Sequence, residues 1–153
     1  MSPLLATIDV EATSRLRVVI GRLSRRLRPT EAAIAAGLTP TRISVLLHVA
    51  RAGQIRLSEL SDAEGINPTM MSRVIADLAQ DGLVERASDP SDRRAAFVEP
   101  TAAGRKLAER IRRERTDALN VALDGLDDRE RSQIEAALPA LERLAEELKG
   151  DRP

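Results

Sequence analysis

The segment Leu57–Pro100, LSELSDAEGINPTMMSRVIADLAQDGLVERASDPSDRRAAFVEP, decides the fold. Its first half predicts two short helices separated by a turn at Gly65, because glycine readily ends a helix. The second helix is expected to follow Asn67, a good capping residue, with Pro68 at its first position and Gly82 at its end. Two short helices joined through a tight turn form a candidate helix-turn-helix.

Apolar residues recur at helical spacing in the second predicted helix. Its inner face is expected to consist of Met71, Val74, Ile75 and Leu78. Four residues near the helix start are then expected to point outward, namely Thr69, Met70, Ser72 and Arg73. These types suit the major groove of duplex DNA, where arginine can donate two hydrogen bonds to guanine and methionine can pack on a thymine methyl group. A solvated amphipathic helix has the same pattern, and for this helix alone that plainer interpretation is favoured.

The end of the segment predicts a β-hairpin with the strands LVERAS and AAFVEP. The connection DPSDRR is longer than a two-residue turn, so it places Arg93 and Arg94 at a projecting tip. An arginine at such a tip can enter the narrow minor groove, and Asp92 can brace Arg94 through a charge-assisted hydrogen bond. A solvent-facing turn without a role is the alternative. The position of the tip directly after a candidate recognition helix makes this alternative the weaker one.

Amphipathic helices are predicted on both sides of the segment. The first runs from about Ile8 to the high twenties, with Asp9 or Thr7 as its cap, and the next begins after Thr39 and ends before Gly53. Behind the hairpin, a long helix is expected between a cap at residue 101 and a stop near residue 125.

The last predicted helix carries an almost regular apolar seam made of Ile134, Leu138, Leu141, Ala145 and Leu148. Pro139 is expected to bend this helix or to mark a break in it. Paired across a two-fold axis, the first and last helices would bury their seams and set two recognition helices about 34 Å apart, one turn of DNA. A monomer whose terminal helices fold back on its own core is the less favoured alternative.

The order of these elements resembles the winged helix-turn-helix core of the MarR family over residues 38–104. The most specific part of the resemblance is Asp92-x-Arg94, followed by an apolar pair, Thr101 and Gly104. The resemblance implies a mainly α-helical fold with a small β-hairpin wing. It also implies dimerisation helices in residues 1–37 and 105–153, on either side of a DNA-binding domain in residues 38–104.

A homodimeric, sequence-specific transcription regulator follows from the same resemblance, most often a repressor released from a pseudo-palindromic DNA site by a small phenolic or other lipophilic ligand. By the family's pattern, the recognition helix contributes Thr69, Met70, Ser72 and Arg73. Arg94 corresponds to the wing residue that enters the minor groove, with Asp92 as its brace. Two positions depart from the pattern: Glu99 weakens the local positive field, and Pro100 shortens the last strand.

Composition limits the other function classes. The 153 residues include 24 Lys+Arg and 24 Asp+Glu, so overall charge predicts no partner. With no cysteine and a single histidine, His48, the chain is expected to hold no enzyme active site, metal or cofactor. No apolar run approaches the length of about 20 residues that spans a bilayer, and the N-terminus lacks a signal-peptide pattern. A cytoplasmic protein without membrane contact is therefore expected.

A small lipophilic or anionic effector is the partner that the sequence reveals least. Arg22, within the basic run RLRVVIGRLSRRLR, is a weak candidate for holding an anion, and most of that run is expected to be a solvated helix face. His48 could line an effector pocket, although a packed histidine without function is the favoured interpretation. Two other functions stay open: a small-molecule carrier or sensor of the same fold with weak DNA affinity, and a helical protein–protein adaptor.

Overall fold

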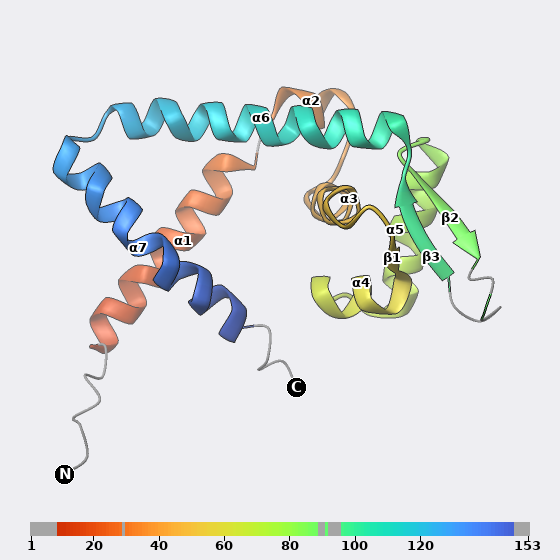
Figure 1. The fold of residues 1–153 in the computed structure, drawn as a ribbon, viewed down its shortest axis with the longest axis horizontal. Coiled ribbons are helices and arrows are strands. Elements are labelled where there is room, and N and C mark those ends of the chain that lie inside the picture. The colour runs from red at the N-terminus through yellow and green to blue at the C-terminus, as the bar shows by residue number, and fades with distance from the viewer. Residues whose placement is uncertain (1–8, 29, 89–90, 92–95, 149–153) are drawn as a thin grey trace, which may run out of the picture.

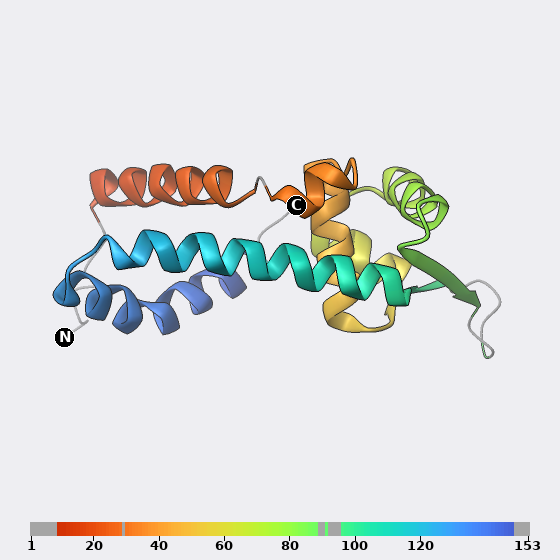
Figure 2. The same ribbon diagram turned by 90° about the horizontal axis from the view of Figure 1, so that it is seen from above.

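The computed structural model describes residues 9–28, 30–88, 91 and 96–148. Their helices are α1 (Val10–Leu27), α2 (Glu31–Ala35), α3 (Pro40–Ala52), α4 (Leu57–Glu64), α5 (Pro68–Gln80), α6 (Ala102–Asp124) and α7 (Asp128–Glu147). The strands are β1 (Ile55–Arg56), β2 (Val84–Ser88) and β3 (Ala96–Pro100). Figure 1 shows α6 as a long strut, with α3, α4, α5 and the sheet at one end and α1 and α7 at the other. In Figure 2, α1 and α7 lie on opposite sides of α6.

The sheet is antiparallel, with β3 in the centre between β1 and β2. Val98 of β3 lies opposite Ile55 of β1 and Arg86 of β2. Pro100, the last residue of β3, lies opposite Val84 and is fully buried. The expected hairpin and the mainly α-helical fold with a small β wing are confirmed, and β1 adds a third strand.

Side-chain caps fix the starts of the helices that frame the winged part. The Asn67 side chain accepts a hydrogen bond from the Met70 N–H at 2.8 Å, so α5 begins with Pro68 at its first position. Thr101 caps α6 in the same way by accepting from the Gly104 N–H at 3.0 Å. These predicted caps are confirmed.

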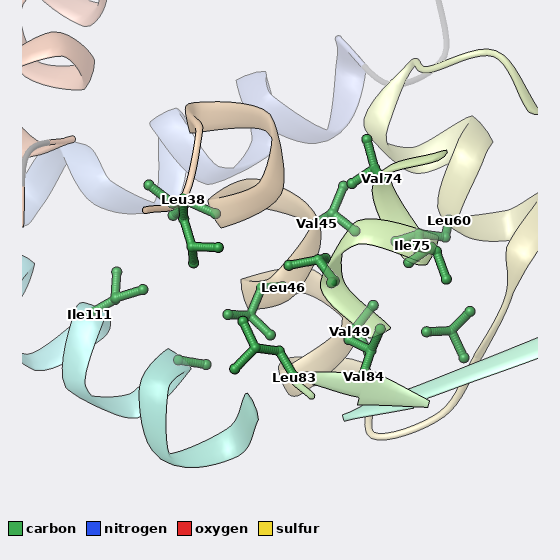
Figure 3. Packing of buried hydrophobic residues seen from close by; sticks show 14 of the residues in the cluster. Leu38, Val45, Leu46, Val49, Leu60, Val74, Ile75, Leu83, Val84 and Ile111 are labelled. Atoms are coloured by element: carbon green, nitrogen blue, oxygen red, sulfur yellow. The ribbon is translucent and has the colours of Figure 1, made fainter. Parts of the chain in front are cut away.

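One hydrophobic core joins α2, α3, α4, α5, the sheet and the first half of α6 (Figure 3). Its largest fully buried side chains include Leu46, Leu60, Met71, Ile75, Leu78 and Ile111. The predicted inner face of α5 is confirmed, since all four of its residues are buried. Because this core lies entirely at one end of the strut, it holds α5 and the wing in a fixed relation.

Some elements differ from the sequence-based expectation. The helix α2 was not predicted, because five residues are too short for a detectable period; it forms because Thr30 caps it and because Ala32 and Ala33 pack in the core. The two-residue strand β1 was also missed, since only its pairing with the distant β3 defines it. In α4, helical spacing predicts that Leu60 and Ala63 face inward; Leu60 is buried, but Ala63 is exposed and Ser61 is buried in its place.

The terminal helices remain outside this core. Neither α1 nor α7 buries a side chain within its described length, and both expose large apolar residues. The helix α7 runs through Pro139 without the break that was allowed for. No helix within the described ranges is long and apolar enough to cross a membrane.

Candidate nucleic-acid interface

The outward face of α5 is the centre of the candidate interface. Thr69 and Arg73 are exposed and lie one turn apart, opposite the buried face of the helix. The same spacing places the exposed Ala76 and Gln80 on this stripe, in continuation toward the helix end. Neither residue is among the site residues predicted on α5, which all lie near the start of the helix. The helical spacing alone could have identified them.

Contacts on both flanks hold α5 in place. On one side, Arg42 of α3 forms an ion pair with Asp77 at 2.5 Å. On the other side, Arg86 of β2 donates from Nη2 to the carbonyl oxygen of Ser72 at 3.1 Å. A recognition element held on both flanks and along its inner face loses little conformational entropy when it docks. Ser72 lies on the β2 flank and is half-buried, so it is less accessible than Thr69 and Arg73.

Met70 lies on the other flank of α5, with 52% of its surface exposed. It lines a cleft of about 660 Å³ that separates the start of α5 from α1 and α6. Other apolar side chains that line this cleft are those of Leu27, Leu47 and Ile66. The predicted contact of Met70 with a thymine methyl group stays a prediction, and the structure adds a second surface that this side chain faces.

The wing continues directly from α5 through β2 and β3 (Figure 1). The predicted tip residues Asp92, Arg93 and Arg94 lie outside the described residues. Within the described part, the Arg56 guanidinium lies over the Phe97 ring, 5.3 Å from its centroid, which ties β1 to β3. Glu99 lies directly opposite Glu85 across the β2–β3 ladder.

The cleft beside Met70 contains two arginines, Arg28 at the end of α1 and Arg115 of α6. Burial, and secondarily the positive charge of Arg28, lower the pKa of the Arg115 guanidinium from its ordinary value. Arg115 remains a cation at neutral pH, since arginine is effectively always protonated. Its Nε is buried and has no hydrogen-bond partner among the residues that the structure describes. A buried donor of this kind favours an acceptor, and an anion above all.

His48, the predicted pocket histidine, is half-buried and lines a smaller cleft of about 230 Å³ together with Arg51 and Arg112. Its Nδ1 lies 2.7 Å from one carboxylate oxygen of Glu64, and the Ser44 hydroxyl donates to the other at 2.7 Å. This geometry gives His48 a structural partner that ties α3 to the end of α4. Arg22 is exposed on α1 and lines neither of these two clefts.

Comparison with known proteins places this geometry among bacterial regulators. The family model described as the MarR family matches residues 38–96. An uncharacterized HTH-type transcriptional regulator of Mycobacterium bovis is 32% identical over 139 residues, which cover 91% of this chain and 96% of that protein. An HTH-type transcriptional regulator of Mycobacterium tuberculosis is similar to the same extent, with 32% identity over 91% of this chain and 96% of its own length.

Solved structures share the fold over nearly the whole chain. The crystal structure of RV1404 from Mycobacterium tuberculosis has a TM-score of 0.79 at 20% identity, over 92% of this chain and 96% of that one. Wild-type MarR from E. coli in its apo form has a TM-score of 0.74 at 22% identity, over 92% and 97%. NadR in complex with 4-hydroxyphenylacetate has a TM-score of 0.70 at 22% identity, over 99% and 100%.

Proposed function

Because the chain belongs to the MarR family of DNA-binding transcriptional regulators, we propose that it is a ligand-responsive repressor that binds a pseudo-palindromic operator as a homodimer. The observation that carries the proposal is the exposed stripe of α5, which the core and both flanks hold rigidly. The family of its relatives supports a regulator rather than a carrier with weak DNA affinity or an adaptor. As a protein of this type, it would act in the cytoplasm.

In the proposed complex, α5 lies in the major groove, with Thr69 and Arg73 turned toward base edges and phosphates. Arg73 can donate a bidentate pair of hydrogen bonds to guanine, and Ser72 and Met70 border the contact on either flank. Arg94 at the wing tip enters the adjacent minor groove, with Asp92 as its brace and Arg93 beside it. Two such units, related by a two-fold axis, would read two half-sites about one DNA turn apart.

The dimer is proposed from the unpaired faces of α1 and α7. In α1, the exposed apolar residues include Val18, Val19, Ile20 and Leu23. In α7, they include Ile134, Leu138, Leu141 and Leu144. The two helices also carry opposite charge, since α1 has five arginines and one acidic residue whereas α7 has six acidic residues and three arginines. Packing of α1 on the α7 of a second copy would bury both apolar faces, and each buried side chain contributes about 1.5–3 kcal/mol.

The proposed assembly gives different parts of the chain different functions. We assign residues 1–37 and 105–153 to dimerisation and residues 38–104 to DNA binding. Two segments serve both parts, because α2 and the first half of α6 pack into the core of the winged domain. The strut α6 therefore belongs to both functional regions.

The effector is proposed to be a small anion with an apolar body, held in the cleft between α1, α5 and α6. Arg115 and Arg28 would hold its charge, and the apolar body would contact Leu27, Leu47 and Met70. Such a ligand would touch the recognition helix directly, and this contact gives it a means to change DNA binding. His48 and Arg22 are no longer favoured as its ligands, because neither lines this cleft.

The DNA-binding function is tested by selection of random double-stranded DNA with the purified full chain, followed by sequencing. An enriched inverted repeat is expected, together with a dimer in sedimentation velocity. Leu138→Asp should dissociate the dimer, because Leu138 lies on the apolar face of α7, whereas Ala136→Asp on the opposite face should leave it intact. A monomeric wild type, or enrichment of single sites alone, contradicts the dimeric model.

The effector class is tested by thermal unfolding in the presence of 4-hydroxyphenylacetate, benzoate and octanoate, one compound at a time. A compound that binds the folded state raises Tm as its concentration increases. Arg115→Ala should abolish that rise, and Arg22→Ala, which removes an exposed arginine of the same charge, should preserve it. If none of the three anions shifts Tm, or if Arg115→Ala responds like the wild type, the anion site is wrong.

A further inference from the structure

One turn in the middle of α6 contacts two separate elements of the winged domain. Arg112 donates from Nη2 to the carbonyl oxygen of Leu47 in α3 at 3.0 Å. Glu114 accepts from the Ala32 N–H in α2 at 3.1 Å, and its side chain is half-buried. In Figure 1, α2 lies against α6, and α3 is seen end-on below it. Two side chains of one helical turn thus bridge the strut to α2 and to α3.

The bond to Ala32 meets a specific need of α2. A helix leaves its first amides without partners, and Ala32 is 2% exposed, so water cannot serve as the acceptor. Thr30 satisfies the next amide, that of Ala33, at 3.2 Å. A carboxylate also interacts favourably with the positive end of the helix dipole. Since a helix of five residues has no stability of its own, Glu114 and Thr30 together hold α2 in place.

Glu114 is itself held in position. Its second carboxylate oxygen accepts from Nε of Arg110 at 3.1 Å, one turn earlier in α6. Both oxygens therefore have partners, and the side chain is fixed at an orientation that matches the start of α2. A charged group bound at both oxygens resists displacement more than a neutral hydrogen bond does.

We propose that Arg112 and Glu114 form a polar clamp that fixes the angle between the winged domain and α6, and thereby sets the half-site spacing that the dimer reads. The spacing role rests on the proposed dimeric function. The strut continues from the clamp to an exposed end, where Val121 is 73% exposed and free to join the dimer interface. A change of angle at the clamp is carried through both protomers. DNA rises about 3.4 Å per base pair. If the change of angle moves one recognition helix by that distance along the DNA, this helix no longer matches its half-site.

The clamp is adjacent in sequence to a residue that lines the proposed effector cleft. Arg115, whose Nε is buried and unpartnered among the described residues, follows Glu114 directly in α6. The residue that binds the effector and the residue that holds α2 therefore lie on the same turn. Glu114 and Arg112 act as positioning residues for DNA binding, since neither lies on the outward stripe of α5.

The test compares Glu114→Ala and Glu114→Gln with a matched control, Asp117→Asn, which removes an acidic charge at an exposed position of α6. Each full-length protein is titrated against the operator selected by the wild type and against versions with one or two base pairs inserted or removed between the half-sites. Wild type and Asp117→Asn should prefer one spacing. Glu114→Ala should bind that operator about tenfold more weakly, on the scale of a lost charged hydrogen bond, and should discriminate less between spacings.

Glu114→Gln keeps an acceptor for the Ala32 N–H and should recover most of the spacing preference. A general loss of stability, in contrast, would weaken binding to operators of all spacings equally. Hydrogen exchange of the segment that contains α2 is measured in parallel, and Glu114→Ala should speed it. If Glu114→Ala retains the wild-type spacing preference, or if the exchange of α2 is unchanged, the clamp is overturned. If the wild type itself is monomeric or shows no preferred spacing, the proposed dimeric function fails and the spacing role fails with it.

Discussion

Gly104→Ala should destabilise the winged domain through a clash with the backbone. Gly104 lies in the first turn of α6, where the helix presses on the chain that leaves α5. A Cβ atom at this position would lie 1.9 Å from the carbonyl oxygen of Leu83, whereas ordinary contacts begin at 3.4 Å. The obstacle is main chain and cannot rotate away as a flexible side chain would. The two segments must therefore separate by about 1.5 Å, given the overlap that such crowding produces.

The loss in free energy of unfolding can be estimated from the contacts that this separation disrupts. Leu83 is buried in the core, and overpacking of a core costs about 1–3 kcal/mol. The carbonyl oxygen of Leu83 also accepts from the Thr101 N–H at 3.1 Å, and Thr101 in turn donates to the Gly82 carbonyl oxygen at 2.6 Å. Loss of one such bond adds about 1 kcal/mol, and the better helix propensity of alanine recovers about 1 kcal/mol. Since the last two terms cancel, the net loss in free energy of unfolding is expected to be about 1–3 kcal/mol.

Urea denaturation followed by circular dichroism, at one fixed protein concentration, measures this loss. Gly125→Ala at the other end of α6 is the control, since its Cβ would meet the Ala122 carbonyl oxygen at 3.4 Å, an ordinary contact, and φ is −77°. It should change the free energy of unfolding by less than about 0.5 kcal/mol. If Gly104→Ala is as stable as Gly125→Ala, the close approach of α6 to Leu83 is not a feature of the folded protein.

Three further predictions concern the DNA-binding surface. Arg73→Ala should cost about 1–3 kcal/mol in operator binding and relax the preference at one base position, as measured by titration against single-base variants of the operator. Arg94→Ala should weaken DNA binding severely in a gel-shift titration at fixed salt while sedimentation still shows a dimer; unchanged affinity would refute its role in the wing. Glu99→Gln should raise DNA affinity and stabilise the hairpin, because it removes a negative charge near the DNA and the repulsion from Glu85 across the ladder, worth about 0.2–1 kcal/mol. A weaker operator complex would show instead that Glu99 has a favourable partner in the bound state.

Local signals in the sequence predicted most of the helices and the hairpin. Caps such as Asn67 and Thr101 act on amides only three residues away, so the residue types and their spacing suffice to place a helix start. The buried face of α5 was likewise predicted, because a single stripe faces one core. For α3, helical spacing predicts a buried face of Ile43, Leu46, Leu47 and Ala50, of which the first two are buried and the last two half-buried. Val45 and Val49 are buried as well, since several elements cover this helix at once.

Features that depend on distant partners could not be predicted. The capping of α2 by Glu114 joins residues 82 positions apart, and no local pattern in the sequence indicates it. The cleft proposed for the effector likewise depends on the fold, since Arg28, Met70 and Arg115 come from the end of α1, from α5 and from α6. Arg22, the residue predicted from the same basic run, does not line this cleft, because spacing along α1 does not reveal which arginine lies next to the winged domain.

Although the formal net charge is +0, positive and negative side chains are concentrated on different helices, an arrangement that suits both the proposed dimerisation and the proposed DNA binding. The arginines of α1 and the carboxylates of α7 form separate blocks, and at a dimer interface each block would neutralise the other. They would then add little to the attraction between the protein and DNA. Attraction to phosphate would depend on a few cations near α5 and the wing, among them Arg73 and Arg94. A protein arranged in this way should show a salt dependence that corresponds to few phosphate contacts per half-site, and neutralising the wing arginine should reduce that slope by about one in each half-site. A slope that stays unchanged in Arg94→Ala but falls when arginines of α1 are replaced would show that α1 faces DNA and that the dimer is built from other surfaces.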